Sequence, residues 1–472
     1  ASNNTAIGRS ALVANTTGYD NTAVGASALD SNTTGSLNTA FGKSALQSNT
    51  TADSNNAFGR RALYTNTTGA QNTGLGYLAL YLNTTASYNT SVGNSSMQSN
   101  TTGAKNTAVG YGALSENTTG TENVVVGEVA LDANTTGSYN TAIGRHALSS
   151  NTTASSNTAV GRNALGDNTT GYDNVAVGRN ALDANIGGHS NTALGESSLT
   201  SNTEGDRNVA IGQNALAVNT TGSENIAIGR GALDANTTAN GNVAIGDNAG
   251  TLCTTGNRLV AIGYNAAQSY TTGGYTTAIG YEALQRATDA TSNTAIGSRC
   301  LEDCTTGGLN TAVGEASMYK VTTGTNNCAL GQSGIGLTTG TFNIFAGKNS
   351  GNNLTTGSNN IFIGTGNLAS AAGGANQIVM GDTVTSAGNS NFTFGFDSTD
   401  SNIAFGATSI TAPSDIRLKE DIQDEEVGLD FINDLRPVTF LWKKEKDIPS
   451  EMKAYKEGSE ERTMNGKYNH GF

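Results

Sequence analysis

The chain contains unusually few proline, cysteine, aromatic and charged residues. Of its 472 residues, 3 are proline, 4 are cysteine, 6% are aromatic and 13% are charged. Four cysteines are too few to staple a chain of this length, so the fold does not rest on disulfides. No apolar run approaches the ~18 residues that read as a membrane-spanning helix. We therefore expect no membrane insertion in this segment, and the composition argues against an ordinary mixed α/β enzyme.

The charge balance and the scattered histidines exclude further classes. There are 25 Lys and Arg residues against 38 Asp and Glu, which gives a net charge of −13 and makes a nucleic acid an unexpected partner. The histidines stand singly, with no cluster of metal-ligand spacing. The Gly-x-x-x-x-Gly spacings lack the Lys-Ser/Thr of a phosphate loop. We expect neither a metal nor a cofactor.

What the sequence does have is a repeat. Asn-Thr-Ala-Ile-Gly (4–8) returns as Asn-Thr-Ala-Val-Gly (21–25), and the closing glycine recurs every seventeen residues from Gly8 to Gly331. Seventeen residues differ from a whole number of α-helical turns by about a quarter turn. In a helix, the apolar side chains of successive repeats would therefore point in different directions and form no continuous apolar face. A chain that returns to the same place each period suits the pattern better. It predicts an all-β fold, a parallel β-solenoid or β-roll.

The repeat also predicts the domain organisation and the parts of each coil. Regular coils fill residues 1–347, and shorter, drifting copies fill 348–412. Asn-Thr-Ala-Val/Ile-Gly is a short strand. Asn-Thr-Thr-Gly is a turn whose glycine, such as Gly35, is free to take positive φ. The Ala28-Leu29 pair between them is a second strand or a single helical turn, and its sequence does not decide which.

Stacked coils place identical residues above one another. We expect the asparagines that open the strands to form a ladder in which each side-chain amide bonds the next coil. Each coil offers about one β-branched residue and one Leu for burial, which is little against the entropy of ordering seventeen residues. Packing several chains side by side would bury the Ala and Leu faces further. This reasoning predicts an oligomer, most simply a homotrimer.

The unit N-T-A-V-G-x-x-A-L resembles the head repeats of YadA-like trimeric autotransporter adhesins, over roughly residues 4–347. The resemblance implies left-handed parallel β-rolls assembled as homotrimers, and an adhesive role outside the cell. That family's repeat is usually shorter than seventeen residues.

Twelve coils carry Asn-Thr-Thr, which is formally an N-glycosylation acceptor. The alternative is that these asparagines are turn residues and partners in a ladder, and this reading is favoured. A glycan requires an asparagine on the outside of the coil. The twelve are Asn15, Asn32, Asn49, Asn66, Asn83, Asn100, Asn117, Asn134, Asn151, Asn168, Asn219 and Asn236.

The composition changes sharply near residue 412. All three prolines lie at or after Pro413, and 24 of the 59 residues from 414 to 472 are charged, against 39 of the 413 before them. This shift predicts a separate, small α+β domain over 413–472. Within it, Glu425–Leu435 has the apolar spacing of an amphipathic helix, and Val438–Trp442 that of a strand.

Residues 414–422, Ser-Asp-Ile-Arg-Leu-Lys-Glu-Asp-Ile, resemble the opening of the peptidase S74 domain, the intramolecular chaperone at the C-terminus of phage tail fibres, tailspikes and endosialidases. Leu435-Arg-Pro-Val-Thr-Phe-Leu-Trp-Lys443 and the final Tyr-Asn-His-Gly-Phe continue the likeness across 414–472. The family's domain normally runs further, so we expect a shortened copy, and a chain that begins at Ala1 without Met reads as a processed product or fragment.

The S74 resemblance implies self-processing once a trimer has folded. A Ser hydroxyl attacks the peptide bond on its own N-terminal side, and a Lys five residues on activates it. The matching residues are Ser414 as nucleophile, Lys419 as base and Pro413–Ser414 as the scissile bond. A Lys serves as the base when burial lowers its pKa.

Together these features favour an extracellular structural and adhesive fibre of the phage tail fibre type. It would be a homotrimer that binds a host cell-surface glycan or protein receptor. A bacterial surface adhesin or extracellular filament is the alternative that the repeats favour. A tailspike depolymerase is a third possibility, but it needs a carboxylate pair about 5–9 Å apart, and no pair stands out in the sequence.

Overall fold

The computed structural model separates into two compact units, Ala1–Ala412, which we call the shaft, and Pro413–Phe472. The residues that it describes are 2–397, 400–408, 438–440, 443–450, 455–461 and 469–471.

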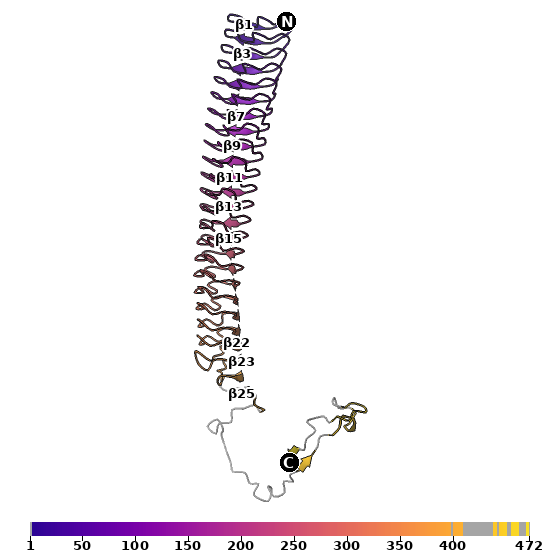
Figure 1. Ribbon diagram of the computed structural model, residues 1–472, viewed down its shortest axis with the longest axis vertical. Helices are drawn as coiled ribbons and strands as arrows, with labels where there is room; N and C mark the ends of the chain where they lie inside the picture. The colour runs from indigo at the N-terminus through magenta and orange to yellow at the C-terminus, as the bar shows by residue number, and fades with distance from the viewer. Residues whose placement is uncertain are drawn as a thin grey trace. The chain divides into compact units, whose positions relative to one another are not determined.

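The shaft is a single 25-stranded sheet, and most of its strands are three residues long. They stack one above another along the unit (Figure 1). The strands are β1 (Thr5–Ile7), β2 (Thr22–Val24), β3 (Thr39–Phe41), β4 (Asn56–Phe58), β5 (Thr73–Leu75), β6 (Thr90–Val92), β7 (Thr107–Val109), β8 (Val124–Val126), β9 (Thr141–Ile143), β10 (Thr158–Val160), β11 (Val175–Val177), β12 (Thr192–Leu194), β13 (Val209–Ile211), β14 (Ile226–Ile228), β15 (Val243–Ile245), β16 (Val260–Ile262), β17 (Thr277–Ile279), β18 (Thr294–Ile296), β19 (Thr311–Val313), β20 (Cys328–Leu330), β21 (Ile344–Ala346), β22 (Ile361–Thr365), β23 (Gln377–Asp382), β24 (Asn391–Phe396) and β25 (Ser401–Ala404).

Successive strands pair in parallel at the interval of the sequence repeat. Thr5 lies opposite Thr22 and Ala6 opposite Ala23, so each residue sits on its equivalent seventeen residues later. The register holds from coil to coil until β20, and the final pair, β24 with β25, is antiparallel. The prediction of an all-β parallel solenoid built from seventeen-residue coils is confirmed.

The Ala-Leu segment is neither a strand nor a helical turn. It is a sequence of turns in which Ser27 and Leu29 take φ of 57° and 51°, in the left-handed region, and the same two positions do so in coil after coil. A non-glycine residue there costs energy unless the surroundings fix it. Leu29 is held because its side chain is fully buried and its N–H donates to the Ala45 carbonyl of the next coil at 3.1 Å.

Glycine is required where strands such as β2 end, whereas the turn position also accepts alanine in some coils. Gly25 has a φ of 140°, and a Cβ there would lie 2.4 Å from the carbonyl oxygen of Gly42. The expectation of positive φ in Asn-Thr-Thr-Gly is wrong, because Gly35 is absent from the residues with positive φ. The restriction at Gly35 is close approach instead, since a Cβ would meet the Ala52 carbonyl oxygen at 2.4 Å. Ala52 occupies the same turn position one coil on, so the coil can adjust there.

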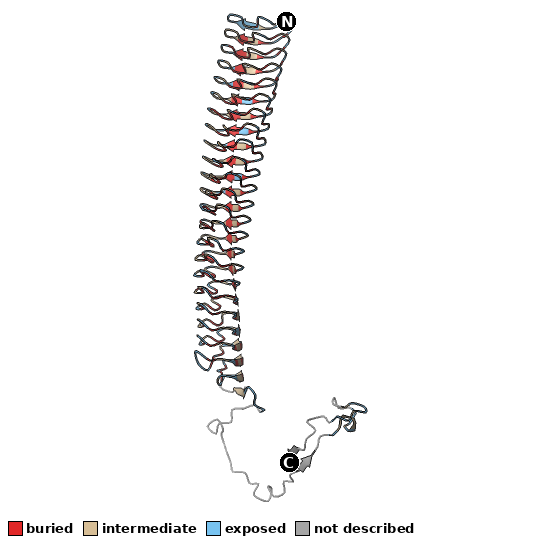
Figure 2. Ribbon diagram, in the orientation of Figure 1, coloured by how far each residue is buried: buried red, intermediate tan, exposed pale blue. Residues whose placement is uncertain are grey.

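The interior of each coil is filled by small residues and one leucine. Ala23, Ala28 and Leu29 are completely buried, and Figure 2 shows buried residues in most strands along the shaft. Side chains alternate across a strand, so only the middle residue of three points inward. The β-branched residue that was expected in the core, such as Val24, is therefore only half-buried. Because the Ala and Leu faces are already closed within one chain, a neighbouring chain cannot bury them further, and that part of the prediction is wrong.

The first and third residues of strands β1–β21 form what we call the outer sheet face. The third position is almost always apolar, and examples such as Phe41, Leu194 and Leu330 are 54%, 46% and 50% exposed. In several coils the first residue is also β-branched and apolar, as at Val124 and Val175. The shaft therefore presents a narrow apolar row along its length.

The asparagine of Asn-Thr-Thr also forms a row, which changes character part-way along the shaft. It is asparagine in every coil from Asn15 to Asn236, and we call this stretch the amide row. Beyond it the same position is occupied by less polar residues, all buried: Cys253, Tyr270, Ala287, Cys304, Val321, Leu337 and Leu354.

In the second unit the structure describes two strands, β26 (Val438–Phe440) and β27 (Asn469–Gly471), which pair antiparallel. The short 3₁₀ helix η2 (Glu445–Asp447) follows β26. Glu445 accepts hydrogen bonds from the ammonium of Lys456 at 3.0 Å and the hydroxyl of Ser459 at 2.8 Å. The strand that the sequence predicts at Val438 is confirmed over its first three residues. The helix expected over Glu425–Leu435 lies outside the described residues.

Candidate functional site

The residues predicted for self-cleavage, Pro413, Ser414 and Lys419, lie outside the described residues. Their assignment stays a prediction that rests on the sequence motif.

The formal glycosylation sites lie in the amide row, inside the coil. Each amide bonds its neighbours on both sides: Asn49 Nδ2 donates to Asn32 Oδ1 at 2.8 Å and to the Ala52 carbonyl at 3.0 Å, while Asn66 Nδ2 donates to Asn49 Oδ1 at 3.0 Å. The half-buried Asn15 stands at the start of the row, and its Oδ1 accepts from Asn32 Nδ2 at 2.9 Å. The fully buried members among the twelve are Asn32, Asn49, Asn66, Asn83, Asn100, Asn117, Asn134, Asn151, Asn168, Asn219 and Asn236.

The asparagines that open the strands form the expected ladder, in which each side-chain amide bonds the next coil; in some coils two amides bond directly, as Asn55 Nδ2 does to Asn38 Oδ1 at 3.3 Å. The N–H of Asn38 donates to Asn21 Oδ1 at 3.0 Å, so the main contact between coils joins a side chain to the backbone. The Asn38 amide itself donates to the Ala52 carbonyl at 2.8 Å. Direct bonds between two amides are the regular feature of the amide row instead. The repeat revealed both rows, but only the path of the backbone decides which groups meet.

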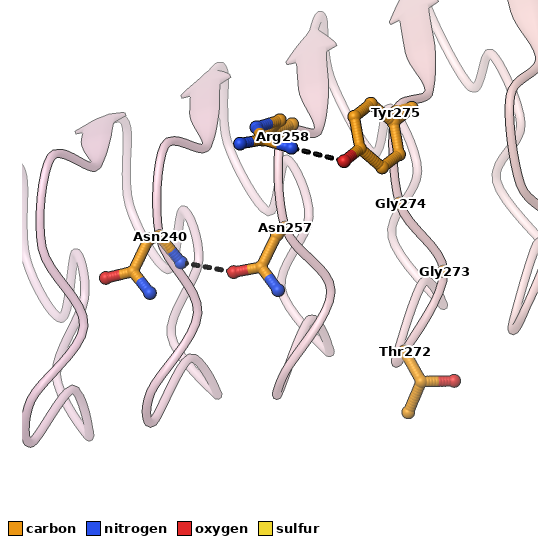
Figure 3. A pocket seen from close by; sticks show the side chains of 7 residues that line it. All are labelled: Asn240, Asn257, Arg258, Thr272, Gly273, Gly274 and Tyr275. Carbon is orange, nitrogen blue, oxygen red and sulfur yellow. Dashed lines mark hydrogen bonds between the residues drawn. The ribbon is translucent and has the colours of Figure 1, made fainter.

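A polar hollow of about 360 Å³ opens on the surface of the shaft where Gly273 and Gly274 follow each other, and we call it the Gly274 hollow (Figure 3). The Arg258 guanidinium lies 5.0 Å from the centroid of the Tyr275 ring, and its Nη1 donates to the Tyr275 hydroxyl. Figure 3 shows this pair at one side of the hollow and Thr272 apart from it. The remaining lining residues are Asn240 and Asn257.

A second hollow, of about 390 Å³, lies over Gly166, and we call it the Asp183 hollow. Burial, and then the charge of nearby Asp167, raise the pKa of the Asp183 carboxyl above its usual value. Arg145 and Arg162 also line it. The sequence search missed this carboxylate pair because its members come from neighbouring coils, sixteen residues apart. Comparing acidic residues at intervals near seventeen would have found it.

Three of the four cysteines, Cys253, Cys300 and Cys304, are fully buried, and burial raises the pKa of each thiol to about 12. Each thiol donates to a backbone carbonyl at 3.2–3.3 Å, as Cys253 does to Gly256. A neutral thiol bonded in this way is neither a good nucleophile nor a good metal ligand. In the described ranges no group of three or more His, Cys, Asp or Glu side chains could hold a metal ion. No helix among the described residues is long and apolar enough to span a bilayer.

Comparison with known proteins finds one likeness, in the second unit. Residues 414–458 match the model of the peptidase S74 family, described as the chaperone of endosialidase. The matched range begins at Ser414 and covers the motif that carries the predicted Ser414 and Lys419. No curated protein matches the chain, and no solved structure matches it. The shaft is therefore interpreted from its own geometry.

Proposed function

We propose that this chain is a subunit of a homotrimeric extracellular fibre of the phage tail fibre type. The observation that carries the proposal is the combination of a long β-solenoid shaft with a peptidase S74 match in the adjoining unit. In the fibre, the shaft would extend from its anchorage and touch a glycan or protein on the surface of a host cell. The S74-like segment would act as an intramolecular chaperone for the trimer.

The outer sheet face supports self-association. Monomeric soluble proteins rarely expose contiguous apolar patches above a few hundred Å². On the shaft, an apolar side chain such as Val126 or Ile143, each 39% exposed, recurs on this face at nearly every coil. Sister chains meeting along this face would cover the row while leaving the polar turns in water.

Light scattering on the full chain tests the assembly. We expect a mass three times that of the 48.0 kDa chain. Val126→Lys with Ile143→Lys should lower the mass, because two charges would enter the interface. The matched control, Thr119→Lys with Thr136→Lys, places two charges at the same spacing on exposed turns and should leave the mass unchanged. A monomeric unsubstituted chain would refute the trimer.

We further propose that the precursor cuts itself at Pro413–Ser414. Ser414 Oγ would attack the carbonyl carbon of Pro413 while Lys419 takes the hydroxyl proton. The Pro413–Ser414 C–N bond would break as Lys419 returns this proton to the leaving Ser414 nitrogen, which leaves an ester between Pro413 and Ser414 Oγ. Water would then hydrolyse the ester and free the shaft. Ser414→Ala and Lys419→Ala should each leave uncut precursor, and the released fragment should begin at Ser414 by mass spectrometry. A Ser414→Ala protein that still gives this fragment would exclude the assignment.

Binding to a cell surface tests the role as a fibre. Fluorescently labelled full chain should bind intact bacterial cells of the host range and lose this binding when the cell-surface glycans are stripped. Absence of binding to every cell panel would contradict adhesion. A gene neighbourhood of secretion functions, rather than tail functions, would favour the bacterial adhesin to which the repeats are similar.

One observation favours a tailspike depolymerase as a second candidate. The Asp183 hollow brings Asp167 and Asp183 together and holds one carboxyl with a raised pKa, which is the property of a general acid. Incubation with capsular polysaccharide should then yield oligosaccharides, and Asp183→Asn should abolish their release. Unchanged polymer length with the unsubstituted protein would remove this candidate.

A further inference from the structure

The Gly274 hollow occupies a gap in a row of hydrogen bonds. The residue that follows Asn-Thr-Thr-Gly places a side-chain oxygen above the backbone N–H of its equivalent one coil earlier. Asp206 N–H donates to Ser223 Oγ at 3.0 Å, and Ser223 N–H donates to Asn240 Oδ1 at 2.7 Å. Asn240 N–H then donates to Asn257 Oδ1 at 2.7 Å. Gly274 is next in the row and has no side chain to continue it.

Two consequences follow at Gly274. The N–H of Asn257 lacks an acceptor among the described residues, and it opens into the hollow. A small side chain would also fit with a slight shift of the backbone, because the one atom near a Cβ built on Gly274 would be the Asn257 carbonyl oxygen, at 3.3 Å. A backbone donor therefore points at a position where three preceding coils supply an oxygen and this coil supplies none.

Arg258 adds an uncompensated positive charge beside that donor. Other cations at the same position of the coil pair with a carboxylate one coil on, as Arg207 does with Glu224 at 2.8 Å. Arg258 is flanked by Gly241 and Tyr275, and within the described ranges it forms no ion pair with a carboxylate. Thr272, which lines the hollow, donates its hydroxyl to the Asp289 carboxylate at 3.0 Å.

A neighbouring glycine shows what is particular to this place. Gly308 stands at the same position two coils on and also lacks a side chain. The residues beside it, Ser292 and Leu309, carry no charge, and no ring and guanidinium pair adjoins it. The combination of open donor, free cation and exposed ring belongs to the Gly274 hollow.

We propose that the Gly274 hollow binds the carboxylate of an acidic saccharide. The Asn257 N–H and the Arg258 guanidinium would donate to the carboxylate oxygens, as charge-assisted bonds. The Tyr275 ring, 64% exposed, would lie against the apolar face of the sugar, and Asn240 would meet its hydroxyls. A saccharide fits better than a peptide because the hollow is shallow and polar, with no apolar recess for side chains. This inference rests on the proposed adhesive function and names its receptor class.

The test measures binding of small sugars to the full chain by titration calorimetry. The acidic probes are 3′-sialyllactose and trigalacturonate, whose carboxylates come from different sugars, and the neutral probes are lactose and methyl-esterified trigalacturonate. We expect one acidic probe to bind at least tenfold more tightly than its neutral counterpart, and the better of the two identifies the source of the carboxylate. Equal binding of acidic and neutral probes, or tighter binding of an oligoglutamate peptide, would overturn the proposal.

Two variants and a control locate the site. Arg258→Gln removes the cation, and Gly274→Ser supplies the missing oxygen and fills the hollow as Ser223 does in its own coil. Each should weaken binding of the acidic probe at least tenfold, and Gly274→Ser should not lower the melting temperature. Arg207→Gln, which removes a paired cation at the same coil position, should leave binding unchanged. Variants that bind like the unsubstituted chain would overturn the proposal.

The same variants separate this inference from the proposed function. If the unsubstituted chain adheres to cells and Gly274→Ser adheres equally well, the receptor site lies elsewhere and this inference fails while the fibre function stands. If the unsubstituted chain adheres to no cell surface, the proposed function itself fails.

Discussion

Removing one member of the amide row gives the sharpest test of how the shaft is held together. Asn117 lies in the middle of the row and is fully buried. Its Nδ2 donates to Asn100 Oδ1 at 2.8 Å and to the Gly120 carbonyl at 3.0 Å, and its Oδ1 accepts from Asn134 Nδ2 at 2.8 Å. Asn117→Ala deletes all three bonds at once.

The size of the effect depends on which partners are left unsatisfied. The Gly120 carbonyl keeps a second donor, Asn106 Nδ2 at 2.9 Å. Asn100 Oδ1 and one N–H of the Asn134 amide lose their partners inside the coil. At about 1–3 kcal/mol for each buried orphan, Asn117→Ala should reduce the local free energy of unfolding by about 2–6 kcal/mol.

Hydrogen exchange measured by mass spectrometry suits a stack of coils, because each coil can open locally. The amide of Thr118, which donates to the Thr135 carbonyl at 2.9 Å, should exchange at least ~30-fold faster in the variant, since 1.4 kcal/mol is a factor of ten. Thr119→Ala, in the same turn but exposed, is the control and should change exchange little. If the two variants behave alike, the amide row does not stabilise the shaft.

The sequence of the shaft indicates that the loss of stability in Asn117→Ala comes from the neighbouring amides that lose their hydrogen-bond partners. Beyond Asn236 the same row is continued by Cys, Tyr, Ala, Val and Leu side chains, all buried. If consecutive asparagines of the row are all replaced by apolar side chains, no amide between them loses a partner. If a single asparagine is replaced, the amides of the coils before and after it each lose one hydrogen-bond partner. The pair Leu337 and Leu354 therefore occupies the position without the loss that we expect at Asn117.

Three further predictions concern the buried rows. Cys253→Asn should change the free energy of unfolding by less than about 1 kcal/mol, because its amide would pair with Asn236 Oδ1, which is buried without a partner, while its own Oδ1 would become the unpaired atom at the end of the row; a rise of several degrees in the melting temperature would contradict this. The raised pKa values of the Cys253, Cys300 and Cys304 thiols mean that the folded state holds protons which the unfolded state releases above pH 9. Stability should therefore be intact below about pH 9 and fall towards pH 12, by about 1 kcal/mol per pH unit for each thiol, and replacing the three by Ala should flatten the decline in thermal melts. Peptide mapping of folded protein secreted from a glycosylating host should find the amide-row sites from Asn32 onward unmodified, since a glycan at any of them would break the row; a glycan mapped to one of them would show that these sites are accessible.

The sequence predicted the fold well because the length of its repeat equals the number of residues between paired positions of neighbouring strands. Thr22 on Thr5 and Ala23 on Ala6 follow from the seventeen-residue interval alone. The repeat did not show in the same way which side chains face the interior of the coil and which face solvent. Val24 looked like a core residue and Leu29 like part of a strand or helix, yet Val24 faces outward and Leu29 sits in a left-handed turn.

Sequence reasoning missed both hollows, because their residues come from neighbouring coils and gain their roles from what the next coil lacks. Arg258 is one of several arginines in the repeats. It becomes distinctive only because Gly241 and Tyr275, rather than a carboxylate, lie beside it. Burial in the coil, and then the charge of Asp167, raise the pKa of the Asp183 carboxyl, and burial alone raises the pKa of Asp234 three coils on.

The amino-acid order by itself determined that the chain stacks upon itself and how far apart like residues lie, since a strict repeat leaves one register. The tertiary structure alone decided which side chains close the interior, which amides bond one another, and where a donor and a cation stand without partners. These depend on the path of each coil, because the directions of Cβ and N–H are set by local φ and ψ and not by the interval between repeats.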